Sequence, residues 1–144
     1  MNNIGFTGTR KGMTKKQRES FQKLIESFKI KEFHHGDCIG ADKESHDIIK
    51  KLDPKPKIMG HPPKYSKYRA FCKADIWLKP KDYLTRNKDI VDSTDILIGI
   101  TAGKEKLMSG TWSTIRYARK KDKPIYIISP DGKLKVENIE QEIK

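Results

Sequence analysis

Apolar runs alternate with helical patterns along this chain, and that alternation restricts the fold more than any other feature of the sequence. The runs expected as strands are residues 3–8, 32–36, 56–61, 95–100 and 123–129. The segments expected as helices are 14–28, 41–52, 82–93 and 110–121. Runs such as "DILIGI" and "KPIYIIS" are continuous, which is typical of strands buried on both faces of a parallel sheet. The pattern predicts an α/β protein, a three-layer sandwich around a mostly parallel five-stranded sheet.

The length of the chain fits one domain. Its 144 residues are enough to bury roughly two-thirds of the unfolded surface around one core. We therefore expect a single domain over 1–144, interrupted by an insertion around 61–82 that follows neither the strand nor the helix pattern. In the insertion, aromatic residues from Tyr65 to Trp77 are interleaved with lysines, and loops of this length tend to be functional or mobile.

Charge and cysteine content restrict the partners and the compartment. The formal net charge is +12, which favours an anionic partner such as a nucleotide, a nucleic acid or a membrane surface. The lysines are spread along the whole chain, so charge alone marks no patch. Cys38 and Cys72 form no CxxC pair, and the first residues do not resemble a signal peptide. With no apolar run of about 20 residues, we expect a cytoplasmic protein with no membrane partner.

Polar, glycine-bearing loops follow three of the expected strands. Gly8-Thr9-Arg10 follows the first, "GDCIGAD" (36–42) follows the second, and "TAGKEKLMSGT" (101–111) follows the fourth. The carboxyl ends of parallel strands meet at one edge of the sheet, where ligands bind in such folds. We expect the three loops to converge there, with Thr9 and the planar guanidinium of Arg10 suited to a phosphate.

The second loop leads into a helix at Ala41. Gly36 and Gly40 allow the backbone to approach a ligand closely, and the free amides of a helix start attract anions. Asp37 has no helix to cap, so a ribose hydroxyl is its expected partner. Asp42 either faces the same site or caps its own helix.

The third loop repeats this arrangement. Ser109 can cap the helix that follows, Gly110 permits close approach, and the amide of Thr111 opens the helix. Arg86 and Asn87 begin another helix shortly before the fourth strand, and we expect them to face the same cleft. The alternative for Arg86 is a solvated position on the helix surface.

Metal-ligating residue types gather around the second strand. They are His34, His35, Asp37, Cys38 and His46. Their order matches no zinc spacing, and adjacent residues of a strand point to opposite faces. We therefore expect neither a metal nor a cofactor.

Four segments together resemble the SLOG superfamily: "GFTGTR", "FHHGDCIGAD", "RNKDIVDSTDILIGI" and "SGTWSTIRYARKKDKPIYII". The similarity is greatest to its YspA-like group, and the superfamily also includes the DNA-processing protein A (DprA) family and the LOG (lysine-decarboxylase-like) enzymes. The resemblance covers nearly the whole chain except the insertion and the tail. It implies a Rossmann-like single domain that binds a nucleotide or nucleotide-derived ligand, and it implies a homodimer as well.

The same resemblance bears on catalysis. LOG enzymes carry a glutamate that serves hydrolysis of a ribosyl bond, and Thr114 occupies that position here. Cleavage of an N-glycosidic bond needs a carboxylate. The candidates from the second loop are Asp37 and Asp42, with Glu44 a further carboxylate nearby.

Three functions remain open at this point. The first is a binding protein that senses or sequesters a signalling nucleotide, with an aromatic residue of 65–83 stacked on the base. The second is a nucleotide or nucleoside N-glycosidase. The third is binding of single-stranded nucleic acid through the insertion. We rank a nucleic-acid partner below a small-molecule partner.

Overall fold

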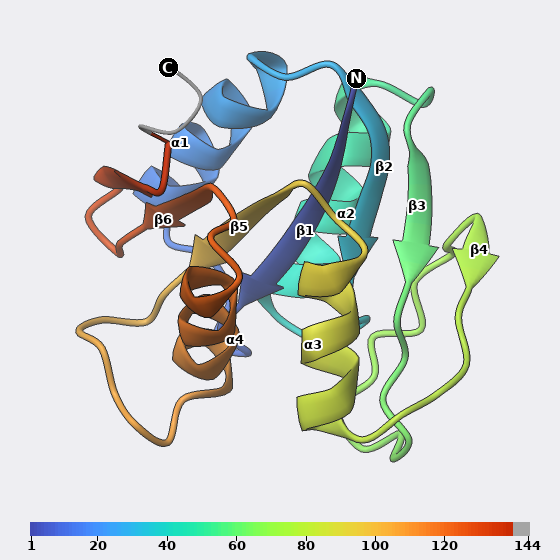
Figure 1. Cartoon of the computed structure of the whole chain (residues 1–144). Helices are drawn as coiled ribbons and strands as arrows, with labels where there is room; N and C mark the ends of the chain where they lie inside the picture. The colour runs from blue at the N-terminus through green and yellow to red at the C-terminus, as the bar shows by residue number, and fades with distance from the viewer. Residues whose placement is uncertain (140–144) are drawn as a thin grey trace.

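A seven-stranded sheet forms the centre of the protein, in a computed structural model that describes residues 1–139 (Figure 1). The strand order is β4-β3-β2-β1-β5-β6-β7, and every neighbouring pair is parallel except β6 and β7. The strands are β1 (Asn2–Gly8), β2 (Ile30–His35), β3 (Lys57–Gly60), β4 (Ile76–Trp77), β5 (Ile96–Ile100), β6 (Ile125–Ile128) and β7 (Leu134–Glu137).

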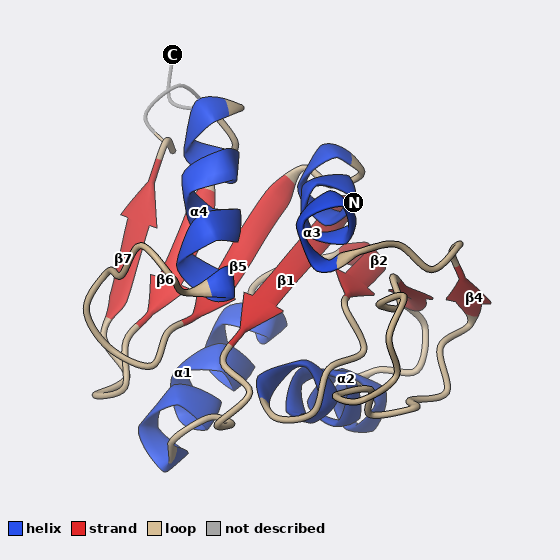
Figure 2. Ribbon diagram, turned by 90° about the horizontal axis from the view of Figure 1, so that it is seen from below, coloured by secondary structure: helices blue, strands red, loops and turns tan. Residues whose placement is uncertain are grey.

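Helices cover both faces of the sheet and make the outer two layers. They are α1 (Lys15–Glu26), α2 (Ala41–Leu52), α3 (Tyr83–Asp92) and α4 (Gly110–Lys120). Figure 2 shows α1 and α2 on one face and α3 and α4 on the other. The predicted three-layer α/β sandwich is confirmed. Within residues 1–139, none of the helices has the length and apolar character needed to cross a membrane.

The predicted number of strands was wrong, because the sheet has seven strands and not five. β4 lies inside the stretch expected to be an insertion and consists of two exposed residues that pair with Met59 and Gly60 of β3. β7 is an antiparallel edge strand whose residues are mostly exposed. Neither strand has enough apolar residues to produce a pattern, so their pairing depends on the sheet that precedes them.

The core lies on both sides of the central strands. Toward α1, the rings of Phe6, Phe21 and Phe33 pack against one another with centroids 5.5 to 6.4 Å apart. Toward α4, a second cluster gathers Leu97, Ile115 and neighbouring buried side chains. Burial on both faces explains the continuous apolar sequences of β5 and β6.

The connections place a topological switch between β1 and β5. From β1 the chain builds outward through β2, β3 and β4, and α3 then carries it back to β5 on the other side of β1. In Figure 1 the arrowheads of β1, β2 and β3 point to the same lower edge. The loops after β1, β2 and β5 therefore meet where ligands bind in folds of this kind.

Close contact between the end of β1 and the start of α2 depends on Gly8. A Cβ atom added there would lie 2.5 Å from Cβ of Ala41 and 3.1 Å from the ring of Phe6. In addition, the N–H of Ala41 donates to the carbonyl of Thr9 at 3.0 Å. The two loops are thus fixed against each other by backbone contact.

We predict that Gly8→Ala lowers the free energy of unfolding by about 2 kcal/mol, because the added methyl must push α2 away from β1. Urea denaturation measures this change. The matched control is Gly110→Ala, whose added Cβ has nothing within 4 Å and should leave stability unchanged or raise it by about 0.5 kcal/mol. Equal effects of the two substitutions would contradict the account of this contact.

Candidate ligand-binding site

A cavity of about 470 Å³ opens at the carboxyl edge of the sheet, between the β1 loop, the β2–α2 loop and the helices α3 and α4. Most of the residues predicted to bind a ligand line it. They are Gly8, Thr9, Arg10, Gly36, Asp42, Arg86, Asn87, Ser109, Gly110 and Thr111. The predicted convergence of loops that lie far apart in the sequence is therefore present in the structure.

Three predicted site residues lie outside the lining: Asp37, Gly40 and Ala41. The amides expected to hold a phosphate at the start of α2 are partly engaged within the protein. The N–H of Ala41 donates to Thr9, and the N–H of Ile39 donates to the carbonyl of Tyr68 at 2.9 Å. This helix start therefore serves mainly to join three loops.

The start of α4 is different, because its first amides remain available. Ser109 caps the helix by accepting the N–H of Trp112 at 3.2 Å. The N–H groups of Gly110 and Thr111 precede the first intrahelical hydrogen bond and have no carbonyl within the helix. Both residues line the cavity, so the positive end of the α4 dipole opens onto it.

Arg86 supplies a buried positive charge to the cavity wall, and the alternative of a solvated side chain is excluded because it is 5% exposed. Its Nη1 donates to the carbonyls of Gly36 at 2.6 Å and His61 at 3.0 Å, and its Nε donates to Asn87 Oδ1 at 2.8 Å. A side chain at position 36 would occupy the space of the guanidinium. Within residues 1–139, no carboxylate forms an ion pair with Arg86.

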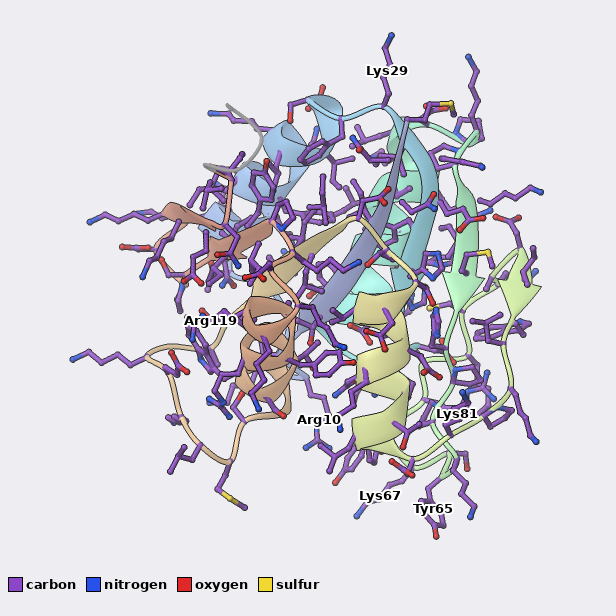
Figure 3. The ribbon with its side chains drawn as sticks, viewed as in Figure 1. Arg10, Lys29, Tyr65, Lys67, Lys81 and Arg119 are labelled. Carbon is purple, nitrogen blue, oxygen red and sulfur yellow. The ribbon has the colours of Figure 1, made fainter. Side chains whose placement is uncertain are left out.

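Two further cations line the cavity from the loop after β1. Arg10 and Lys11 are both exposed. The guanidinium carbon of Arg10 lies 4.1 Å from the ring centroid of Tyr68, which holds it by a cation–π contact. Figure 3 shows Arg10 near the lower ends of α3 and α4. The cavity is therefore positively charged at its mouth.

Asp42 is a carboxylate that lines the cavity while being 6% exposed. Its Oδ2 accepts the N–H groups of Gly36 and Cys38, both at 3.2 Å. Burial raises the pKa of Asp42 to about 6, although the Arg86 charge and the two amides oppose the shift. Asp42 thus fixes the preceding turn and does not cap α2 in the usual way, since the N-cap residue is Gly40.

Asp37, the residue expected to bind ribose, faces the insertion instead. Its carboxylate is fully buried, forms an ion pair with Nε of Arg69 at 2.7 Å and accepts the N–H of Cys72 at 2.9 Å. A positive backbone φ of 55° turns it away from the path of a regular loop. Asp37 therefore anchors the insertion to the sheet.

Two other positions considered for catalysis are engaged in structural contacts. Glu44 accepts the N–H of Met13 at 2.6 Å and pairs with Arg18 at 2.5 Å. Thr114, in the position of the LOG glutamate, is buried and donates its hydroxyl to the carbonyl of Gly110 at 2.9 Å. Of the carboxylate side chains described, only that of Asp42 lines the cavity.

The lining also contains Lys11, Cys38 and Met108, which the sequence did not mark as ligand contacts, and it contains Tyr83. Tyr83 belongs to the aromatic stretch from which a stacking residue was expected, and Arg86 lies 5.4 Å from its ring centroid. Met108 is 97% exposed at the cavity mouth. Burial raises the pKa of the Cys38 thiol to about 11, so it is protonated near neutral pH and is a poor nucleophile.

Histidine pairs occupy the two faces of β2. Nε2 of His35 lies 3.0 Å from Nδ1 of His46, and Nδ1 of His34 lies 2.7 Å from Nε2 of His61. The ligand atoms of His35, His46 and Cys72 come within 4.8 Å of one another. However, Nδ1 of His35 accepts the N–H of Asp37 at 2.9 Å, so its proton is on Nε2. That nitrogen cannot bind a metal unless the contact with Asp37 is lost.

We predict opposite effects on stability for the two carboxylates of this turn at pH 7. Asp37→Asn removes the charge opposite Arg69 and should cost on the order of 1–3 kcal/mol. Asp42→Asn should stabilise the protein by about 1 to 2 kcal/mol, because the folded state disfavours the ionised form of Asp42. At about pH 3, below its ordinary pKa of 3.8, Asp42 is mostly protonated in both states and most of the gain should vanish. Urea denaturation at the two pH values measures both changes, and a loss of stability in Asp42→Asn would contradict the burial effect.

We also predict that the protein loses stability as the pH falls below 6.5. The pKa of His35 and of His61 is lowered to about 3, mainly by burial and to a smaller extent by nearby positive groups. The unfolded chain therefore binds more protons than the folded state between about pH 6.5 and 3, and acid favours unfolding. The raised pKa of Asp42 has the opposite effect on stability, because the folded state binds its proton first. This one group opposes the effect of two histidines.

Denaturation midpoints between pH 7 and 4.5 test this dependence. The variant His61→Gln keeps a donor for His34 and should show a smaller slope, by up to one proton, or about 1.4 kcal/mol per pH unit. An unchanged slope would show that His61 is not held neutral.

Comparison with known proteins adds a fold relationship. No family model matches the chain, and no curated protein matches it in sequence. A solved structure with a similar fold is that of the molybdenum cofactor binding protein from the phototrophic bacterium Rippkaea orientalis. The two superimpose with a TM-score of 0.66 and 21% sequence identity, over 88% of this chain and 76% of that one. At this identity the likeness establishes the shared α/β fold alone.

Proposed function

We propose that this protein binds a phosphorylated, nucleotide-like small molecule in the cavity at the carboxyl edge of the sheet. One observation carries the proposal. The free N–H groups of Gly110 and Thr111 open onto the same cavity as the cationic side chains of Arg10, Lys11 and Arg86. Helix-start amides together with arginine are a common phosphate-binding arrangement in proteins.

The dimensions and walls of the cavity support a small organic ligand. Its volume of about 470 Å³ lies within the range of roughly 300–1,000 Å³ typical of such sites. Tyr83 offers an aromatic face on which a base could stack. The structural neighbour is named as a cofactor-binding protein, which agrees with a small-molecule role for this fold.

Membership of the SLOG superfamily is part of the proposal. The segments that carry the resemblance contribute Gly8-Thr9-Arg10, Gly36, Arg86 and Ser109 to one cavity. The role that follows is that of a cytoplasmic protein that senses or sequesters a signalling nucleotide, and the same resemblance favours a homodimer.

A second candidate function is hydrolysis of an N-glycosidic bond, and one observation favours it. Asp42 is a carboxylate in the cavity with a pKa raised to about 6, which suits a general acid or base near neutral pH. Incubation with ribonucleoside 5′-monophosphates followed by chromatography for free base tests this activity. Release of free base that Asp42→Asn abolishes would establish the enzyme. If the nucleotides stay intact, the N-glycosidase is excluded and the binding function stands.

The proposed phosphate contact is tested by the variant Gly110→Pro. Proline is favoured at the first position of a helix, and the preceding residue, Ser109, has an extended ψ of 127° that proline accepts. The substitution therefore removes one N–H from the cavity without breaking α4. We predict that it weakens binding about ten-fold, whereas Gly110→Ala, which keeps the N–H, binds as the wild type does.

The ligands for this experiment are the four ribonucleoside 5′-monophosphates and molybdenum cofactor. A thermal-shift screen identifies those that stabilise the protein, and calorimetry then compares the two variants. The proposal fails if none of these ligands stabilises the wild type, or if the proline and alanine variants bind equally well.

A further inference from the structure

One oxygen of Asp42 lies in the cavity wall without a partner. Oδ2 accepts the two turn amides, and Oδ1 has no hydrogen-bond partner among residues 1–139. Two side-chain atoms in this range are both unpaired and sealed from solvent, Oδ1 of Asn3 and Oγ1 of Thr101. Oδ1 of Asp42 is not one of them, so it keeps access to the cavity that its residue lines.

The neighbouring cation does not satisfy this oxygen. Nη1 and Nε of Arg86 are directed to two backbone carbonyls and to Asn87, and no direct ion pair joins Arg86 to Asp42. A buried carboxylate with an unused oxygen is costly. Its retention beside a cavity indicates that a group of the ligand donates the hydrogen bond that this oxygen lacks.

The hydrogen-bond capacity of the carboxylate restricts what that group can be. The two N–H groups of Gly36 and Cys38 fill both lone-pair positions of Oδ2, which leaves Oδ1 alone to accept. A paired N–H edge, such as that of guanine or a guanidinium, needs both oxygens at once. A hydroxyl group needs only one.

We propose that Oδ1 of Asp42 accepts a hydrogen bond from a sugar hydroxyl of the ligand, so that the site selects ribose-bearing phosphates. This inference rests on the proposed function, because the phosphate subsite at α4 orients the sugar. Asp42 lies in the first turn of α2 on one face of the sheet, and Gly110 begins α4 on the other face. β1, which ends at Gly8, belongs to the sheet between them. The ligand then spans the edge of the sheet, with its phosphate toward α4 and its sugar toward α2.

The variant Asp42→Asn separates this contact from the turn. The asparagine carbonyl can still accept the N–H groups of Gly36 and Cys38, and its NH₂ group then replaces Oδ1 in the cavity. The turn is retained, while the charged acceptor becomes a neutral group that binds a hydroxyl more weakly. Asp47→Asn is the matched control, since it removes one charge from the exposed side of the same helix.

The experiment measures the affinities of the four ribonucleoside 5′-monophosphates and their 2′,3′-dideoxy analogues by calorimetry. We expect the wild type and Asp47→Asn to prefer the ribose form by about ten-fold or more. In Asp42→Asn the preference should fall to about three-fold or less, with affinity for the dideoxy form nearly unchanged. Thermal denaturation of each variant verifies that it is folded.

The outcomes distinguish this inference from the proposed function. Equal binding of ribose and dideoxy forms by the wild type overturns the inference and leaves the phosphate site intact. A ribose preference that persists in Asp42→Asn also overturns it and assigns the hydroxyl contact to another residue. If none of the nucleotides binds, both the inference and the proposed nucleotide-binding function are overturned.

Discussion

The remaining geometry of the site depends on the carboxylate of Asp42 closing the turn between β2 and α2. By accepting the N–H groups of Gly36 and Cys38, it fixes the direction of the Gly36 carbonyl. That carbonyl receives the guanidinium of Arg86 from α3, which lies on the opposite face of the sheet from α2 (Figure 2). One buried acid thereby links the two faces at the edge where the loops meet. Because two amides stabilise only one of its oxygens, the other is left to the cavity.

Two helix starts that were both expected to bind an anion have different functions in this fold. The N-terminus of α2 contacts the loop after β1 through Ala41 and Thr9, and the insertion contacts the adjoining turn through Ile39. The N–H groups of Ala41 and Ile39 are therefore used in joining these segments. The N-terminus of α4 follows a long polar loop. Among residues 1–139 no hydrogen bond from another segment engages the N–H groups of Gly110 and Thr111, so both are free for a ligand. An anion site therefore requires a helix start that the fold leaves uncovered, and the sequence motif alone does not guarantee one.

The sequence was sufficient for five of the seven strands, the four helices and the convergence of the loops, since parallel topology brings the carboxyl ends of strands to one edge. It could not separate Asp37 from Asp42, because both follow the same strand. The distinction depends on a positive φ at Asp37 and on Arg69, which is 32 residues away in a segment without periodicity. The burial of Arg86 was equally hidden, because it requires the carbonyls of Gly36 and His61 from other elements. β4 and β7 are too short or too exposed to leave a pattern.

The central claim is that the opening of α4 holds the anionic end of a small ligand. Backbone amide NMR during titration with ribonucleoside 5′-monophosphates tests it most directly, since each N–H reports its own hydrogen bond. The account predicts saturating downfield shifts for the amide protons of Gly110 and Thr111, together with changes in the loop that contains Arg10. Shifts confined to the basic insertion at 61–82, or none at the start of α4, would contradict it.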